Sequence, residues 1–142
     1  MKQAHILLVE DNEGDIYLTR EAVEESKIIN KLSVIKNGSD VMDFLHKKKT
    51  FADAETPDLI LLDLNLPKKN GLEVLAEIKG SDEFKMIPVV MLTTSSSKTD
   101  IAESYKRDVN CFITKPLDAD SFLKVITDTE NFWFQIVTLP KP

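Results

Sequence analysis

The sequence contains very little cysteine, with Cys111 as the one thiol among 142 residues. A single thiol can form neither an internal disulfide nor a cysteine-rich metal site, and such usage is typical of a reducing compartment. Long apolar runs are also missing. Near the N-terminus only Ile6–Val9 is a continuous run of strongly apolar residues before acidic residues begin, which is too short for a signal peptide or a membrane span. We therefore expect a cytoplasmic protein with no membrane partner.

An excess of positive charge is missing as well. The chain has 18 Lys and Arg residues against 24 Asp and Glu residues, which gives a formal net charge of −6. This balance excludes a general nucleic-acid binder, which needs a basic surface to displace counterions. The remaining composition, 42% hydrophobic and 30% charged, is that of an ordinary globular chain. The length predicts a single domain over residues 1–142, with no output domain after Pro142.

Five short apolar runs are spread along the chain. Three of them are continuous four-residue runs that do not alternate with polar residues. Strands that are buried on both faces have this pattern, as in a parallel sheet covered by helices. The runs are Ile6–Val9, Leu32–Ile35, Leu59–Leu62, Val89–Leu92 and Cys111–Ile113.

Segments with helical spacing of apolar residues follow these runs. Five repeats of strand and helix predict βαβ units, a parallel sheet and right-handed crossovers. The expected helix faces are Ile16, Thr19, Ala22 and Val23; Val41, Phe44 and Leu45; Val74, Leu75 and Ile78; Ile101, Ala102 and Tyr105; and Phe122, Val125, Ile126, Thr129 and Trp133.

Local signals suggest where some of these segments begin and end. Ser39 or Asp40 is the expected N-cap of the second helix, and Gly80 is the stop signal of the third. The polar stretch from Lys47 to Pro57 is interpreted as a loop. His5 has no ligand partners nearby in the sequence, so a surface or strand-edge position is expected.

Functional side chains follow four of the predicted strands. Glu10 and Asp11 come after the first run, Asp63 after the third, Thr93 after the fourth and Lys115 after the fifth. In a parallel sheet the carboxyl ends of all strands meet at one edge, where ligands of open α/β sheets bind. Each residue alone could be an ordinary turn or cap residue. Together they predict a site.

The chemistry of that site follows from its charges. Three crowded carboxylates raise one another's pKa unless a cation is present, and hard oxygen ligands suit Mg²⁺. Lys115 offers a point charge for a carboxylate or a phosphoryl oxygen, and Thr93 offers a hydroxyl donor. Asp63, on the central apolar strand, is the natural nucleophile toward phosphorus.

Four motifs carry a resemblance to a known family. ILLVEDN, LILLDLNLPKKNGLEVL, PVVMLTTS and FITKPL resemble the receiver domain of bacterial two-component response regulators, and the resemblance extends from about Ala4 to about Thr127. It implies a flavodoxin-like, doubly wound five-stranded parallel sheet with strand order 2-1-3-4-5 and five helices. It also implies a signalling domain that catalyses only its own phosphorylation and dephosphorylation.

The resemblance assigns roles to individual residues. Asp63 matches the aspartate that accepts a phosphoryl group from a histidine kinase, and Lys115 matches the lysine that pairs with that group. Glu10 and Asp11 match the acidic pair that holds Mg²⁺ together with Asp63, and Asn65 matches the position whose backbone carbonyl completes the protein's share of the metal ligands. Thr93 matches the switch hydroxyl. Phe112 matches the switch aromatic, where many relatives have Tyr.

Two features narrow the resemblance. The acidic pair reads Glu10-Asp11 instead of the commoner Asp-Asp, and the chain ends in Glu130–Phe134 followed by a short tail. Both are similar to small stand-alone regulators paired with bacterial phytochrome histidine kinases. The resemblance thus implies a phytochrome kinase as partner in a phosphorelay.

Two other functions compete with this interpretation. A haloacid-dehalogenase-like phosphatase also uses a strand-end Asp, a Thr, a Lys and Mg²⁺, but it needs a second Asp where this chain has Asn65. A flavodoxin-type flavin carrier needs a phosphate-binding loop after the first strand, where Glu10 and Asp11 would repel phosphate.

The C-terminal segment, residues 128–142, is expected to form the end of the last helix and a tail. Its apolar residues exceed what the inner face of one helix needs, so a homodimer is expected. The alternative is that the tail folds back on its own domain. The surplus residues are Phe132, Phe134, Ile136, Val137 and Leu139.

Overall fold

A computed structural model describes residues 3–26, 30–93, 102 and 111–128. Its centre is a five-stranded sheet with the order β2-β1-β3-β4-β5. Every neighbouring pair of strands is parallel, which confirms the predicted doubly wound fold. The strands are β1 Ala4–Val9, β2 Asn30–Ile35, β3 Leu59–Asp63, β4 Val89–Thr93 and β5 Cys111–Thr114.

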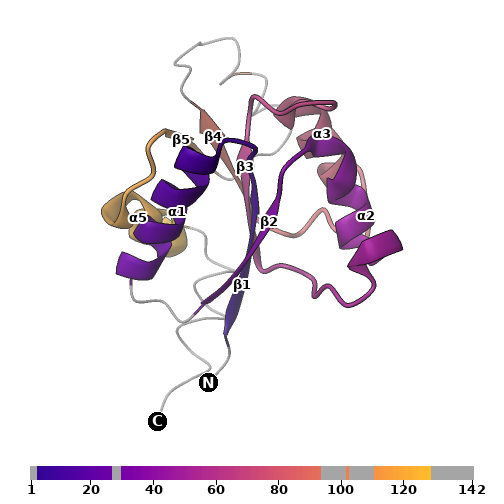
Figure 1. Cartoon of the computed structure of the whole chain (residues 1–142), viewed down its shortest axis with the longest axis horizontal. Helices are drawn as coiled ribbons and strands as arrows, with labels where there is room; N and C mark the ends of the chain where they lie inside the picture. Colours follow the sequence, from indigo (N-terminus) through magenta and orange to yellow (C-terminus); the bar gives the residue numbers. More distant parts are fainter. Residues whose placement is uncertain (1–2, 27–29, 94–101, 103–110, 129–142) are drawn as a thin grey trace.

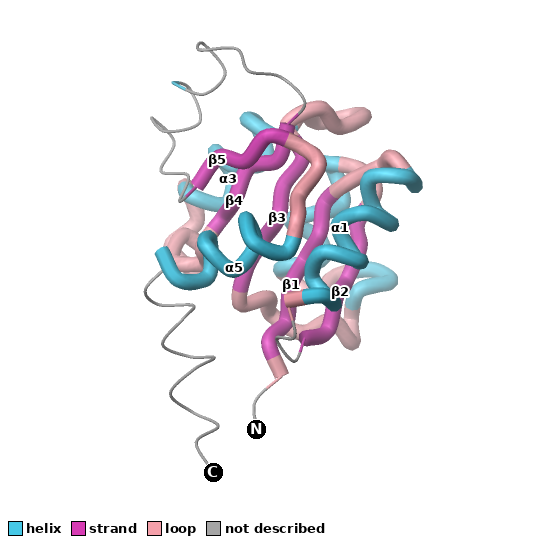
Figure 2. Tube along the Cα trace, turned by 90° about the vertical axis from the view of Figure 1, so that its left-hand side faces the viewer, coloured by secondary structure: helices cyan, strands magenta, loops and turns pink. Residues whose placement is uncertain are grey.

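Helices cover both faces of the sheet. Helices α1 and α5 lie on one face, and α2 and α3 lie on the other (Figures 1 and 2). The predicted fourth helix, at Ile101 to Tyr105, lies outside the described residues apart from Ala102. The described helices are α1 Glu13–Glu25, α2 Val41–Leu45, α3 Gly71–Lys79 and α5 Ala119–Asp128. None of them combines the length and the apolar character that crossing a bilayer requires.

The buried strands explain the continuous apolar runs. Along β3, Ile60 and Leu62 belong to the core on the α2–α3 face, whereas Leu59 and Leu61 belong to the core on the α1–α5 face. Successive side chains of a strand point to opposite faces, so a strand covered on both sides needs an apolar residue at every position. All four of these side chains are fully buried.

The predicted N-cap position of α2 is confirmed at Asp40, but another side chain makes the capping hydrogen bond. A short 3₁₀ turn, Gly38–Asp40, precedes α2, and the side chain of Asn37 caps it by accepting from the amide of Asp40 at 3.0 Å. Asp40 occupies the N-cap position of α2 without a side-chain cap bond. Asn37 takes the capping role because its oxygen reaches the amide three residues later, where the first turn begins.

Two further local predictions need correction. The stretch from Lys47 to Pro57 contains a 3₁₀ turn, Lys49–Phe51, whose Phe51 ring packs edge-on against Phe44 with centroids 5.5 Å apart. His5 is buried inside β1, with its Nε2 2.8 Å from Ser33 Oγ. A hydroxyl on the neighbouring strand thus satisfies a ring nitrogen of His5, which we expected at the surface or at a strand edge. Gly80, in contrast, follows the last residue of α3 as predicted.

Candidate functional site

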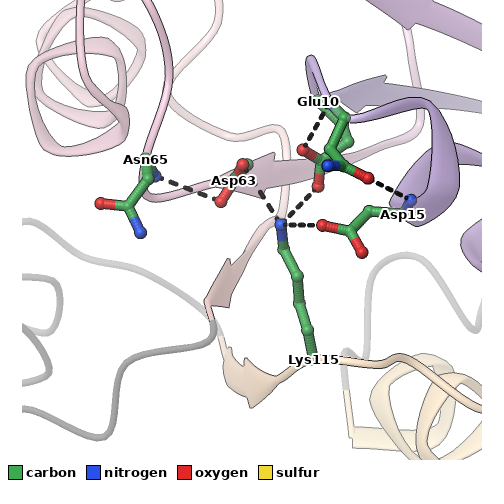
Figure 3. Close-up of polar contacts among 6 residues, drawn as sticks. Glu10, Asp15, Asp63, Asn65 and Lys115 are labelled. Carbon is green, nitrogen blue, oxygen red and sulfur yellow. Dashed lines mark hydrogen bonds and ion pairs between the residues drawn. The ribbon is translucent and has the colours of Figure 1, made fainter.

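The carboxyl edge of the sheet brings the predicted site residues together from distant parts of the chain. Glu10 directly follows β1, Asp63 is the last residue of β3, Thr93 is the last residue of β4, and Lys115 directly follows β5. Because β1, β3, β4 and β5 are adjacent and parallel, these four positions lie along one edge. The close-up in Figure 3 shows the carboxylates of Glu10 and Asp63 converging on the Lys115 ammonium.

Lys115 is the centre of this cluster. Its Nζ lies 2.6 Å from Glu10 Oε1, 2.9 Å from Asp15 Oδ2 and 3.2 Å from Asp63 Oδ2. The Lys115 side chain is 10% exposed, that of Glu10 1% and that of Asp63 4%. Its backbone is fixed too, because the Lys115 amide donates to the carbonyl of Thr93 at 2.7 Å. One ammonium therefore neutralises part of a largely buried negative cluster.

Asp63 is held in one orientation. Its Oδ1 accepts from the amide of Asn65 at 3.1 Å, while its Oδ2 faces Lys115. The first residue of α3, Gly71, packs against its backbone: a Cβ atom on Gly71 would lie 2.4 Å from the Asp63 carbonyl oxygen. The loop after β3 thus orients the Asp63 carboxylate with a backbone amide, and Gly71 allows α3 to pack closely against the Asp63 backbone.

Burial and charge pairing together set the pKa values of Glu10 and Lys115. Loss of water raises the pKa of Glu10 to about 7, although the Lys115 hydrogen bond opposes that change. Burial would lower the pKa of Lys115, but its hydrogen bonds to Glu10 and Asp15 and the charge of Asp63 outweigh burial and raise it. Lys115 therefore stays charged, whereas Glu10 keeps its proton to a higher pH than an ordinary carboxyl group.

The acidic residues of the cluster fit a divalent cation. One carboxylate oxygen each of Glu10, Asp11 and Asp63 lie within 4.8 Å of one another. Asp11 is exposed, whereas Glu10 and Asp63 are buried, so the group has a solvent-facing side. Hard oxygen ligands with room for water suit Mg²⁺ and related ions. Asn65 is exposed at the rim of the same group.

The two predicted switch residues share one face of the sheet. Thr93 is fully buried at the end of β4, and alternation places it on the same face as Met91, in the α2–α3 core. Phe112 in β5 pairs with Met91 and packs, half-buried, against that core. A movement of the Thr93 side chain can therefore change the packing of Phe112 on the same face of the sheet.

Asp15 is a member of the cluster that the sequence analysis missed. It is the third residue of α1, and its carboxylate contacts Lys115 from a position 100 residues earlier in the chain. The available signal was its place in the first turn of a helix that begins at the carboxyl edge of the sheet. Glu13 occupies the same turn but pairs with Lys36 instead, so the sequence alone does not tell the two acids apart.

Comparison with known proteins identifies the family. Residues 6–127 match the family model described as the response regulator receiver domain. The chain belongs to this family. Receiver domains are signalling domains that work with a histidine kinase and bind a divalent metal, and the acidic cluster is in keeping with this. Nothing in the comparison supports the phosphatase alternative.

Individual relatives match the receiver domain over almost their whole length. Response regulator Rcp1 of Synechocystis sp. is 45% identical over 95% of this chain and 92% of its own. Its Mn²⁺-bound crystal structure superposes with a TM-score of 0.78. The phosphorylated cyanobacterial phytochrome response regulator RcpA is 44% identical, with a TM-score of 0.80 over 99% of this chain and 100% of its own. The bacteriophytochrome response regulator AtBRR is 41% identical, with a TM-score of 0.84 over 94% of this chain and 96% of its own.

Proposed function

We propose that this receiver domain accepts a phosphoryl group on Asp63 from a phosphorylated histidine kinase. The position of Asp63 carries the proposal: it is a buried carboxylate at the end of a central strand, oriented by the Asn65 amide and facing the Lys115 ammonium. A carboxylate in this setting is fixed and polarised for attack on phosphorus.

The transfer is a displacement at phosphorus. An oxygen of Asp63 forms the new P–O bond while the P–N bond to the kinase histidine breaks, and the electron pair of that bond returns to the imidazole. Lys115 pairs with the oxygens on which negative charge gathers, and the protein contributes mainly positioning and electrostatics. Catalysis is limited to the domain's own phosphorylation and dephosphorylation. We therefore do not assign it as an enzyme acting on other substrates.

Mg²⁺ is the cofactor we propose for this reaction. Glu10, Asp11 and Asp63 would hold it through their carboxylates, together with the backbone carbonyl of Asn65. When bound, the ion supplies positive charge that neutralises the phosphoryl oxygens. The oxygen spacing in the acidic group supports this assignment, as does the Mn²⁺ bound to Rcp1.

Thr93 and Phe112 are the proposed switch. The added phosphoryl group brings charge and acceptor oxygens to the edge of the sheet, and the Thr93 hydroxyl turns toward them. The space it leaves lets Phe112 pack inward, and the surface around the fourth helix, β5 and α5 changes. The shared face of the two side chains supports this coupling.

A phytochrome-type histidine kinase is the proposed partner. RcpA is a phytochrome response regulator and AtBRR a bacteriophytochrome response regulator, and both align with this chain over more than nine-tenths of their length. We also propose a homodimer built from the C-terminal segment. Residues 129–142, which would form its surface, lie outside the described residues. Light scattering with and without beryllofluoride, before and after truncation beyond Asn131, tests the dimer.

Phosphorylation by acetyl phosphate tests the central proposal. With Mg²⁺ present, intact-protein mass measurement should show one added phosphoryl group on the parent protein and none on Asp63→Asn, which keeps the shape but removes the nucleophile. Asp82→Asn is the matched control, because this carboxylate is 99% exposed and pairs only with Lys85 among the described residues. Equal labelling of parent and Asp63→Asn would disprove the assignment.

A further inference from the structure

We infer that Asp15 is a positioning residue for Lys115, which holds the ammonium before phosphorylation and releases it to a phosphoryl oxygen afterwards. This inference rests on the proposed phosphorylation of Asp63. It adds to the site a carboxylate that is neither the phosphoacceptor nor a member of the acidic group suited to a metal. The contact that carries it joins Lys115 Nζ to Asp15 Oδ2 at 2.9 Å.

The position of Asp15 is built into the start of α1. Asn12 is the N-cap of this helix, and its side-chain oxygen accepts from the amide of Asp15 at 2.9 Å. The amide of the same Asn12 donates to Glu10 Oε2 at 3.2 Å. One residue therefore ties the backbone of Asp15 to the carboxylate of Glu10, and the two acids reach Lys115 in a fixed relation (Figure 3).

The number of donors on Lys115 makes Asp15 a competitor. An ammonium group has three N–H donors, and Lys115 meets three carboxylates, those of Glu10, Asp15 and Asp63. A phosphoryl oxygen arriving on Asp63 brings further acceptors. The donor that faces Asp63 can pass to one phosphoryl oxygen, but a further Lys115 donor reaches the phosphoryl group only if the contact with Glu10 or Asp15 weakens.

Exposure decides which contact weakens. The Glu10 side chain is 1% exposed, and a buried carboxylate that loses its cation is strongly destabilised. The Asp15 side chain is 30% exposed, so water can replace the ammonium there at little cost. Asp15 is therefore the partner that Lys115 gives up. Until then it keeps the ammonium at the mouth of the site, within 3.2 Å of the phosphoacceptor.

Beryllofluoride binding at saturating Mg²⁺ measures this competition. Asp15→Asn keeps the shape of the side chain and the backbone bond to Asn12 but removes the competing charge, so beryllofluoride should bind about fivefold more tightly, the upper range for a partly exposed ion pair. Glu13→Gln is the control. It removes one charge from the same helical turn, but its carboxylate is 73% exposed and pairs with Lys36.

The Lys115 ammonium itself provides the second measurement. Its nitrogen NMR signal should shift in Asp15→Asn without any ligand and stay in place in Glu13→Gln. Equal beryllofluoride affinities for the two variants, or an unmoved Lys115 signal, would overturn the role of Asp15. If the parent protein itself fails to bind beryllofluoride, the proposed phosphorylation fails instead, so the two failures are distinct. Asp15→Ala repeats the test if the asparagine variant folds poorly.

Discussion

Two lysine–carboxylate contacts at opposite ends of the sheet show how surroundings change the meaning of an ion pair. Near the amino end, Lys31 on β2 pairs with Glu55 at 2.9 Å, and the two side chains are 44% and 67% exposed. At the carboxyl end, Lys115 pairs with Glu10 at 2.6 Å, almost out of contact with water. The two contacts have similar distances, but the side chains differ in their exposure to solvent.

The two glutamates respond in opposite directions. Pairing with Lys31 lowers the pKa of Glu55, because water still solvates its charge. Burial raises the pKa of Glu10 to about 7 despite its closer lysine. An exposed pair therefore behaves as two compatible charges, whereas the buried cluster holds more negative charge than its lysine can neutralise. The surplus negative charge of the buried cluster favours binding of a cation, whereas an exposed pair has no such surplus.

Removal of each lysine gives the largest expected contrast. Lys115→Met leaves buried Glu10 and Asp63 without their cation and should lower the free energy of unfolding by about 3–5 kcal/mol. Lys31→Met should leave the denaturation midpoint unchanged within measurement error. Urea denaturation of the two variants and the parent checks both statements.

Solution conditions should modulate the Lys115→Met effect in known directions. The folded state raises the pKa of Glu10 above its ordinary value, so it binds a proton more tightly than the unfolded state does. Lys115 lowers the pKa of Glu10 in the parent, so in Lys115→Met that pKa should lie above about 7. The loss of stability should therefore shrink as the pH falls toward about 7, and Mg²⁺ should reduce it at higher pH. Equal stability losses for the two lysine variants would contradict the contrast between the two ends.

The sequence predicted the carboxyl edge better than the amino end for a physical reason. Glu10, Asp63 and Lys115 follow continuous apolar runs, and parallel pairing alone brings strand ends to one edge. The burial of His5 does not follow from such a pattern. It depends on contacts with Ser33 of the neighbouring strand and with the ring of Phe44. Pairwise contacts of that kind are invisible in a single sequence.

The contact of Asp15 with Lys115 is likewise not predictable from the sequence alone. The helical pattern of α1 was predicted from Ile16, Thr19, Ala22 and Val23, and all four are buried. Which polar residue of the first turn points back at Lys115 depends on the direction in which the chain leaves β1. That direction is set by the cap at Asn12, a local geometry that spacing alone does not fix.

Gly71 provides a second, smaller contrast between the site and the exposed surface. In Gly71→Ala the added Cβ would lie 2.4 Å from the Asp63 carbonyl oxygen and 2.7 Å from Leu64 Cα. The backbone must shift, so we expect a loss of about 1–3 kcal/mol in unfolding free energy and slower phosphorylation by acetyl phosphate.

Gly14→Ala is the matched control for that substitution. Gly14 lies in the exposed first turn of α1, where the nearest atom to an added Cβ is the Asn12 side-chain oxygen at 3.2 Å. A side chain can move by a few tenths of an ångström, and alanine favours the helix, so the change should stay within about 1 kcal/mol. If Gly71→Ala labels as fast as Gly14→Ala, the support that Gly71 gives to Asp63 is unimportant.

The pH dependence of the metal affinity is the smallest expected effect and reports most directly on the buried charge of Glu10. A metal binds the ionised carboxylate, so it must displace the proton from Glu10. With a pKa of about 7, Glu10 changes from mostly protonated to mostly ionised between about pH 6 and about pH 8. Across that interval the affinity for Mg²⁺ should rise about tenfold. Calorimetric titration at several pH values measures this affinity, and the proton released on binding makes the measured heat depend on the ionisation heat of the buffer.

Glu10→Gln is the control variant. It should bind Mg²⁺ more weakly, and its affinity should change little between about pH 6 and about pH 8, because no buried proton remains to be displaced. An equally steep rise in Glu10→Gln would mean that another group titrates, and the contrast between Glu10 and Glu55 would lose its functional consequence.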